Sequence, residues 1–236
     1  MRSAVVSDKG GREYNEDFIG EKNVDNIHCF VLADGLGENG NGQIASKVAV
    51  NTVLECFESN PQITPNALRN YLDEAHKNVL KEGIKIGSSI TTTIAVLITD
   101  GNSVIWAHCG DSRVYKIKKY KIQEISDDHS QAFKLFLRDK ISYSDIRNSP
   151  EKNKLLRMLG ESYTFNPTIS KLVPVTSKDA FLLCSDGFWE YITEDLIEMA
   201  LKKTSSVDEC LDYMLYERSK IVPDNSDNFS AIMIYI

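Results

Sequence analysis

The sequence predicts a single α+β domain, and three observations carry that prediction. Short runs rich in β-branched residues fill the middle of the chain, where Asp100-Gly101-Asn102 is the clearest hairpin signal. Two earlier stretches, residues 43–57 and 66–83, carry apolar side chains every three or four positions, as amphipathic helices do. No internal repeat, low-complexity tract or linker interrupts the 236 residues. One domain spanning residues 1–236 is therefore expected.

Local signals place the other elements in order. Thr193 and Ser206 are suitable N-caps for helices that run to about residues 202 and 219. Acidic residues follow Thr193 in the first turn, where the helix dipole favours them. Apolar, β-branched-rich runs predict strands over residues 4–7, 18–21, 29–34, 91–98, 104–108, 114–117, 122–125, 180–185 and 229–236.

Two of these apolar runs end in an Asp-Gly pair. One begins at Cys29 and reads CFVLADGLG; the other begins at Phe181 and reads FLLCSDGFW. An unbroken apolar run bounded by a turn signal is typical of a strand covered on both faces. Glycine after the acid permits a sharp turn or a close backbone approach. Asp-Gly is also a common turn pair in itself, but two copies behind buried strands suggest that Asp34 and Asp186 share a site.

Composition excludes several classes of function. The net charge of −7 and the pI near 5.2 argue against general affinity for nucleic acid or for a membrane surface. No apolar run approaches the roughly 20 residues that span a bilayer. The five cysteines are scattered, without a C-x-x-C pair, so neither a thiolate zinc site nor a disulfide framework is indicated. A reducing, cytoplasmic setting is expected.

Acidic residues recur at the predicted strand ends. They are Asp17, Asp34, Asp111, Asp186 and Asp227. Carboxylates gathered closely raise one another's pKa unless cations lie between them. If these five converge, they bind metal, and an all-oxygen ligand set favours Mg²⁺ or Mn²⁺ over zinc.

Residues 131–157 form a basic segment in an acidic chain. The segment has seven basic and three acidic residues, a local charge of +4. A charged surface with no role beyond solubility explains this pattern, and so does a lid that meets an anionic substrate.

Ordered motifs along almost the whole chain resemble those of the metal-dependent serine/threonine protein phosphatases, the PPM or type 2C family. Each motif is weak alone, but seven in the family's order are specific. They are Arg12-x-x-Asn15-Glu16-Asp17, Ala33-Asp34-Gly35-x-Gly37, Gly110-Asp111-Ser112-Arg113, Asp128-His129-Ser130, Arg157-x-Leu159-Gly160, Ser185-Asp186-Gly187 and Asp227-Asn228.

This resemblance implies the architecture. It implies a single bacterial-type catalytic domain built as a four-layer α-β-β-α sandwich, with two antiparallel sheets face to face and helices outside. A metal cluster would lie at one end, between the sheets. Residues 131–156 would form the family's variable flap.

The resemblance also implies ligand roles for the motif residues. Asp34 would bridge two Mn²⁺ or Mg²⁺ ions, Asp186 and Asp227 would hold the first ion, and the carbonyl of Gly35 would hold the second. Water between the two ions would attack the phosphate.

Four further residues match the family's motifs. Glu16 and Asp17 match the two acids of the first motif and would bind metal, with Glu16 reaching an ion through water. Asp111 would help to hold a weaker third ion. Arg12 would grip the substrate phosphate with its guanidinium fork.

The implied function is hydrolysis of phosphoserine and phosphothreonine in proteins, opposing a cognate cytoplasmic kinase, by a monomer. A catalytically weak phosphoprotein-binding regulator and a hydrolase of small phosphate esters are the alternatives. Leu36, Glu38 and Asn39 stand where relatives carry a histidine or a Gly-His pair, so a metal-bound water would serve as general acid. His129 fits a hydrogen-bonding turn residue better than a catalytic base.

Overall fold

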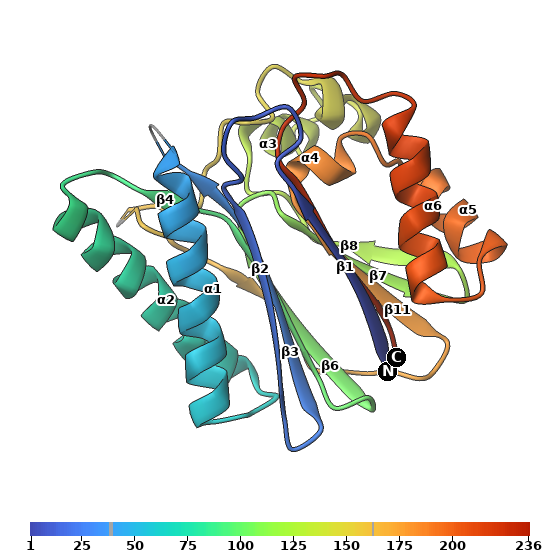
Figure 1. Ribbon diagram of the computed structural model, residues 1–236, viewed down its shortest axis with the longest axis horizontal. Coiled ribbons are helices and arrows are strands. Elements are labelled where there is room, and N and C mark those ends of the chain that lie inside the picture. Colours follow the sequence, from blue (N-terminus) through green and yellow to red (C-terminus); the bar gives the residue numbers. More distant parts are fainter. Residues whose placement is uncertain (38–39, 162) are drawn as a thin grey trace.

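A computed structural model describes residues 1–37, 40–161 and 163–236. Its strands form two antiparallel sheets that lie face to face, with helices on both outer sides (Figure 1). The elements are β1 (Arg2–Asp8), β2 (Asp17–Val24), β3 (Ile27–Leu36), α1 (Gly42–Ser59), α2 (Pro65–Ile86), β4 (Thr91–Thr92), β5 (Ile94–Thr99), β6 (Ser103–Cys109), β7 (Arg113–Lys118), β8 (Lys121–Ile125), α3 (Gln131–Phe136), the 3₁₀ helix η2 (Tyr143–Asn148), β9 (Thr168–Ile169), β10 (Val173–Pro174), β11 (Asp179–Cys184), α4 (Asp186–Trp189), α5 (Glu194–Lys203), α6 (Val207–Ser219) and β12 (Phe229–Tyr235).

The two sheets differ in their strand order. One has the order β1-β12-β11-β7-β8, and the other has β10-β6-β5-β3-β2, with β4 beside β3 and β9 beside β6. Helices α1 and α2 cover the outer face of the β3 sheet, whereas α5 and α6 cover that of the β11 sheet (Figure 1). The α+β class and the four-layer α-β-β-α arrangement expected from the resemblance are confirmed.

Three apolar clusters hold these layers together. The central cluster joins Phe30 and Trp106 of one sheet to Phe181 and Ile232 of the other. A second cluster lies under α1 and α2, and a third lies under α5 and α6. Strands that are covered on both faces must be apolar throughout, which explains the unbroken runs in the sequence.

Two strand boundaries differ from the sequence-based expectation. The predicted strand over residues 91–98 is interrupted at Thr93, whose N–H donates to the carbonyl of Asp34 at 2.8 Å. Strand β3 does not end at Asp34: it continues to Leu36, and Gly35 pairs with Thr92 of β4. A Cβ on Gly35 would lie 2.0 Å from the carbonyl oxygen of Gly42. The glycine is therefore required for a close backbone approach, not for a turn.

The antiparallel registers bring the motif acids to one end of the sandwich. Asp17 opens β2 and pairs with Asp34 of β3. Asp186 follows the end of β11, while Asp111 and Asp227 precede the starts of β7 and β12. Since β11 runs antiparallel to both β7 and β12, its end meets their beginnings.

No helix in the described part of the chain is long and apolar enough to cross a membrane. All five cysteines are free thiols, four of them buried. They pack as small apolar side chains.

Candidate metal centre

An acidic cleft of about 260 Å³ opens where these strand ends meet. Its lining includes seven of the eight residues singled out in the sequence, and the eighth, Asp17, lies buried and hydrogen-bonded to the residue before Asp186. The predicted residues in the lining are Arg12, Glu16, Asp34, Gly35, Asp111, Asp186 and Asp227.

The buried side chain of Asn228 ties the first motif to the last. Its Oδ1 accepts from the backbone N–H of Glu16 at 2.9 Å. Its amide nitrogen donates to the carbonyls of Lys9 and Tyr14 at 2.8 and 2.9 Å. The loop that carries Arg12 is thereby held against the start of β12.

Asp17 is fixed from the other sheet. The hydroxyl of Ser185 donates to its Oδ2 at 2.7 Å and accepts from the N–H of Ser230 at 2.9 Å. The other carboxylate oxygen of Asp17 is buried and has no hydrogen-bond partner among the described residues.

Threonines position the backbone of Asp34. The N–H of Asp34 donates to the hydroxyl of Thr93 at 3.0 Å, and its carbonyl accepts from the hydroxyl of Thr92 at 2.8 Å. The N–H of Gly35 donates to the carbonyl of Glu16 at 3.1 Å. With the backbone fixed on both sides, the Asp34 carboxylate is directed into the cleft that it lines.

Trp189 supports Asp111 from beneath the cleft. Its indole N–H donates to the carbonyl of Asp111 at 2.9 Å. The guanidinium of Arg113 lies 3.6 Å from the centre of the Trp189 ring and donates twice to Asp128, at 2.8 and 2.7 Å. This buried stack and bidentate ion pair ties the start of β7 to Trp189 and to the segment after β8.

Burial and mutual repulsion raise the pKa values of the cleft carboxyls. Burial, followed by the charges of Asp17 and Asp186, raises the pKa of Asp34 well above its usual value. Burial raises the pKa of Asp186 in the same way, with Asp111 as the next cause. Burial raises the pKa of Asp17 to about 6 and that of Asp111 to about 7. Among the residues that line the cleft, Arg12 supplies one positive charge, on Asp227, against five carboxylates.

The donor set fits divalent cations. Several carboxylates that face one cleft stay ionised at neutral pH only when cations lie among them. The buried oxygen of Asp17 that has no partner among the described residues would also be stabilised by a nearby cation. An all-oxygen set suits Mg²⁺ and Mn²⁺.

The side chains are nevertheless engaged with protein donors. Among the described residues, no three His, Cys, Asp or Glu side chains stand so that they could hold an ion without moving. Asp227 pairs with Arg12 at 2.8 Å, and Glu16 accepts from the N–H of Gly42 at 2.8 Å. In this structure the carboxylates of Asp227 and Glu16 are thus held by protein donors.

The basic segment is anchored beside the cleft. Asn153 and Leu155 contribute to the lining. Lys152 pairs with Glu190 at 2.5 Å, and Arg147 donates to Glu194 at 2.6 and 2.7 Å.

The ion pairs of Lys152 and Arg147 show that part of the segment's positive charge anchors it to the rest of the domain. Neither interpretation of the sequence, a solubilising surface or a lid, included this structural role. Arg157 also makes an internal contact, since it lies 3.2 Å from His129. Lys134 and Arg138 of the same segment are exposed.

His129 is a structural residue. Its backbone N–H donates to the carbonyl of Gly110. Of its ring nitrogens, Nδ1 accepts from the backbone N–H of Gly110 at 3.2 Å, and Nε2 lies 2.9 Å from the hydroxyl of Thr168. Leu36 lines the cleft, whereas Glu38 and Asn39 lie outside the described residues.

Sequence reasoning assigned no role to several residues that build the site. Asn228 and Thr93 carried a signal, because both stand within or beside the motifs that were recognised. Trp189 and Asn153 carried none, because only the tertiary fold brings them to the cleft.

Comparisons with known proteins agree with this geometry. The family model described as Protein phosphatase 2C matches residues 9–219. The serine/threonine phosphatase stp of Listeria monocytogenes serotype 4b (strain F2365) is 29% identical over 248 residues, covering 99% of this chain and 95% of that protein. The solved structure of serine/threonine phosphatase Stp1 from Staphylococcus aureus has a TM-score of 0.88 at 26% identity, covering 99% of this chain and 94% of that chain.

A further solved structure holds metal. The catalytic domain of the serine threonine protein phosphatase PstP, in complex with two manganese ions, has a TM-score of 0.83, covering 98% of this chain and 96% of that chain. At 21% sequence identity, this likeness shows that the two chains share a fold and no more.

Proposed function

Since this chain belongs to the protein phosphatase 2C family, and is thus a metal-dependent serine/threonine protein phosphatase, we propose that its acidic cleft hydrolyses phosphoserine and phosphothreonine in proteins. The observation that carries the proposal is the arrangement of carboxylates and one exposed arginine around a single cleft between the sheets.

Each cleft residue receives a role in this proposal. Asp34, Asp186, Asp227 and the carbonyl of Gly35 all line the cleft and would hold two divalent ions, with Asp34 shared between them, Asp186 and Asp227 on the first and Gly35 on the second. When bound, Mn²⁺ or Mg²⁺ supplies Lewis-acid stabilisation of the phosphate and lowers the pKa of water.

Three acids complete the assigned set. Glu16 would reach an ion through water, Asp17 would support the metal site from its place opposite Asp34 in the β2–β3 pair, and Asp111 would help to hold a third, weaker ion. Their raised pKa values support these roles, because the carboxylates gain most from a neighbouring cation.

Arg12 binds the substrate phosphate. Its side chain is 57% exposed, and only Nη2 is engaged, with Asp227. The other N–H donors of the guanidinium remain for two phosphate oxygens. Asp227 thus also positions Arg12, so that the phosphate meets a fork whose orientation is already fixed.

The setting is part of the same proposal. A cognate serine/threonine kinase supplies the phosphorylated substrates, and the chain acts as a monomer in the cytoplasm. Five free thiols support a reducing compartment. Size-exclusion chromatography with light scattering tests the monomer.

Phosphate release from matched peptides tests the substrate class. With Mn²⁺ present, a phosphothreonine peptide and a phosphoserine peptide should be turned over with higher kcat/KM than the same peptide carrying phosphotyrosine. Preference for a small aryl phosphate over every peptide would contradict a protein substrate.

A further inference from the structure

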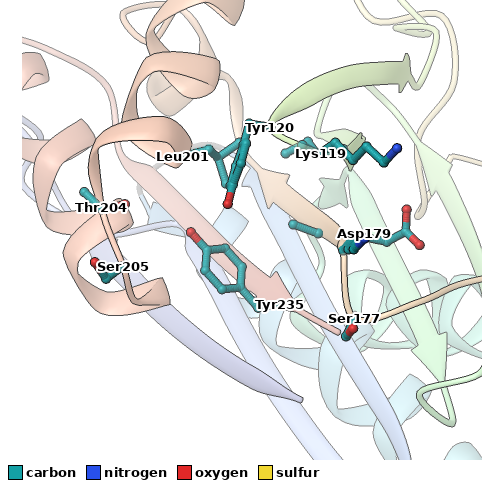
Figure 2. Close-up of a pocket in the computed structure, with 11 residues that line it drawn as sticks. Lys119, Tyr120, Ser177, Asp179, Leu201, Thr204, Ser205 and Tyr235 are labelled. Carbon is teal, nitrogen blue, oxygen red and sulfur yellow. The ribbon is translucent and has the colours of Figure 1, made fainter.

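A second pocket, of about 660 Å³, lies at the opposite end of the strands that lead to the acidic cleft (Figure 2). Its floor is a row across three strands, because Ala180 of β11 pairs with both Ile117 of β7 and Tyr235 of β12. Asp186 lies six residues beyond Ala180, which corresponds to about 20 Å at the rise of a β-strand. The two sites are therefore separate.

Aromatic and aliphatic side chains line one part of this pocket. Tyr120 comes from the β7–β8 turn, Leu201 from α5 and Tyr235 from the end of β12. Figure 2 shows the hydroxyl ends of Tyr120 and Tyr235 converging on the same part of the pocket. The hydroxyls of Thr204 and Ser205 lie nearby, so the apolar surface has hydrogen-bonding groups at its edge.

The charged side chains that line this pocket are mostly positive. Lys119 and Lys178 line the pocket, and neither pairs with a carboxylate of the described residues within salt-bridge distance. The one acid of the lining, Asp179, accepts at Oδ2 from the N–H and hydroxyl of Thr176 at 2.7 and 2.9 Å, and its Oδ1 lies 4.0 Å from the ammonium of Lys118, which does not line the pocket. In a chain of net charge −7, two lysines that pair with no carboxylate of the described residues therefore line this pocket.

Lys119 and Tyr120 form a turn whose backbone conformation lysine and tyrosine seldom adopt. Both residues have positive φ, 49° and 63°, as the two-residue β7–β8 hairpin requires. The β2–β3 hairpin adopts the same geometry with Asp25 and Asn26, at 51° and 65°, which are residues that tolerate it. A lysine and a tyrosine at such positions cost conformational energy that Asn-Gly would avoid.

We propose that this pocket is a binding site for a small anionic ligand with an aromatic ring. The ring packs against Tyr120, Tyr235 and Leu201, and the anionic group meets Lys119 and Lys178. The volume lies in the range of ordinary ligand pockets, which combine apolar walls with a few polar groups. The ligand accounts for the unfavourable turn, because the two residues in the left-handed conformation are two of those that hold it.

The probe is 1-anilinonaphthalene-8-sulfonate, an aromatic anion that a phosphatase cannot hydrolyse. Its fluorescence and calorimetric titration should give one saturable site on the native protein. The uncharged analogue N-phenyl-1-naphthylamine serves as the matched probe and should bind about tenfold more weakly, because it lacks the two charge contacts. Inorganic phosphate and Mn²⁺ should not displace the sulfonate, because they occupy the acidic cleft.

The turn provides a variant that separates binding from folding. The double substitution Lys119→Asn with Tyr120→Gly installs the preferred hairpin pair, so the melting temperature should stay the same or rise. Binding of the sulfonate should nevertheless weaken by at least about tenfold. Lys178→Gln, outside the turn, should weaken binding of the sulfonate while leaving the neutral analogue unchanged.

Three results would each overturn the proposal. The first is the lack of a saturable site on folded protein. The second is unchanged affinity in the turn variant. The third is displacement of the sulfonate by inorganic phosphate, which would place the probe in the acidic cleft.

Discussion

The guanidinium of Arg12 lies 2.8 Å from the carboxylate of Asp227, although 215 positions separate the two residues in the sequence. Asn228, next to Asp227, fixes the loop on which Arg12 lies through its bonds to Lys9 and Tyr14. The residue proposed to bind phosphate and a residue proposed to hold metal are thus joined in one structural unit.

Loss of the Arg12 fork should slow turnover more than it weakens metal binding. Arg12→Ala removes donors aimed at the charge that develops on phosphate, so kcat/KM for a phosphothreonine peptide should fall about 10²-fold or more. Calorimetric affinity for Mn²⁺ should not fall, because Arg12 is not a proposed ligand and its loss leaves the carboxylate of Asp227 unpaired. Arg12→Lys, which keeps the charge without the fork, should recover only part of the rate. Full activity in Arg12→Lys would show that charge alone suffices.

Removal of the Ser185 hydroxyl should destabilise the fold and weaken metal binding. Ser185→Ala leaves a second oxygen of buried Asp17 without a donor and the N–H of Ser230 without an acceptor. The expected cost is about 1–3 kcal/mol in the free energy of unfolding, measured in urea. Ser219→Ala, at an exposed helix end, is the control and should stay within about 0.5 kcal/mol of the wild type.

Acid should weaken the contribution of His129 to stability. Burial lowers the pKa of His129 to about 3, with His108, whose ring stacks on it at 4.5 Å, as the next cause. The folded pKa is below the unfolded value of about 6.5, so the unfolded chain binds more protons between these two limits. The stability that neutral His129 provides is complete above about pH 6.5 and is lost as the pH falls toward 3.

The matched variant is His129→Gln. Its deficit in unfolding free energy against the wild type should be largest at pH 7 and should shrink at pH 4.5. A deficit that is constant across this range would mean that His129 titrates normally in the folded protein.

Loss of the ion pair that anchors the basic segment should weaken binding of large substrates selectively. Lys152 lies next to Asn153, which lines the cleft, and pairs with Glu190 on the core side. Lys152→Met should raise KM for a phosphopeptide about fivefold, the upper range for a partly exposed pair, and leave KM for a small aryl phosphate unchanged. Lys154→Met is the control, because Lys154 pairs with Glu151 within the same segment. Equal effects on both substrates would exclude a role of this anchor in substrate binding.

Local sequence signals predicted the elements better than they predicted the site. The strand ending near Asp34 and the helix after Thr193 followed from apolar runs and caps, because those signals act within a few residues. The break at Thr93 did not follow, because its cause is a hydrogen bond to Asp34, 59 positions away. Asp186 opens a short helix, although its Asp-Gly sequence suggested a turn.

The repeated Asp-Gly pair suggested a shared site for Asp34 and Asp186, but the gathering of all the acids was expected only from the family resemblance. The spacings between Asp34, Asp111, Asp186 and Asp227 follow no helical or strand period. The registers of β7, β11 and β12 bring three of them together, and the packing of the two sheets adds Asp34 of β3. The ion pairs that anchor the basic segment could not be predicted from the sequence either. Glu190, the partner of Lys152, and Glu194, the partner of Arg147, lie far from them along the chain.

One measurement tests the metal-centred account most directly. Wild-type protein and Asp34→Asn are stripped of metal with a chelator, and release of phosphate from a phosphothreonine peptide is followed before and after Mn²⁺ or Mg²⁺ is returned. The account predicts that stripped wild type is inactive and recovers with metal, whereas folded Asp34→Asn does not recover. Turnover by chelator-treated wild type, or near-normal activity of Asp34→Asn, would contradict it.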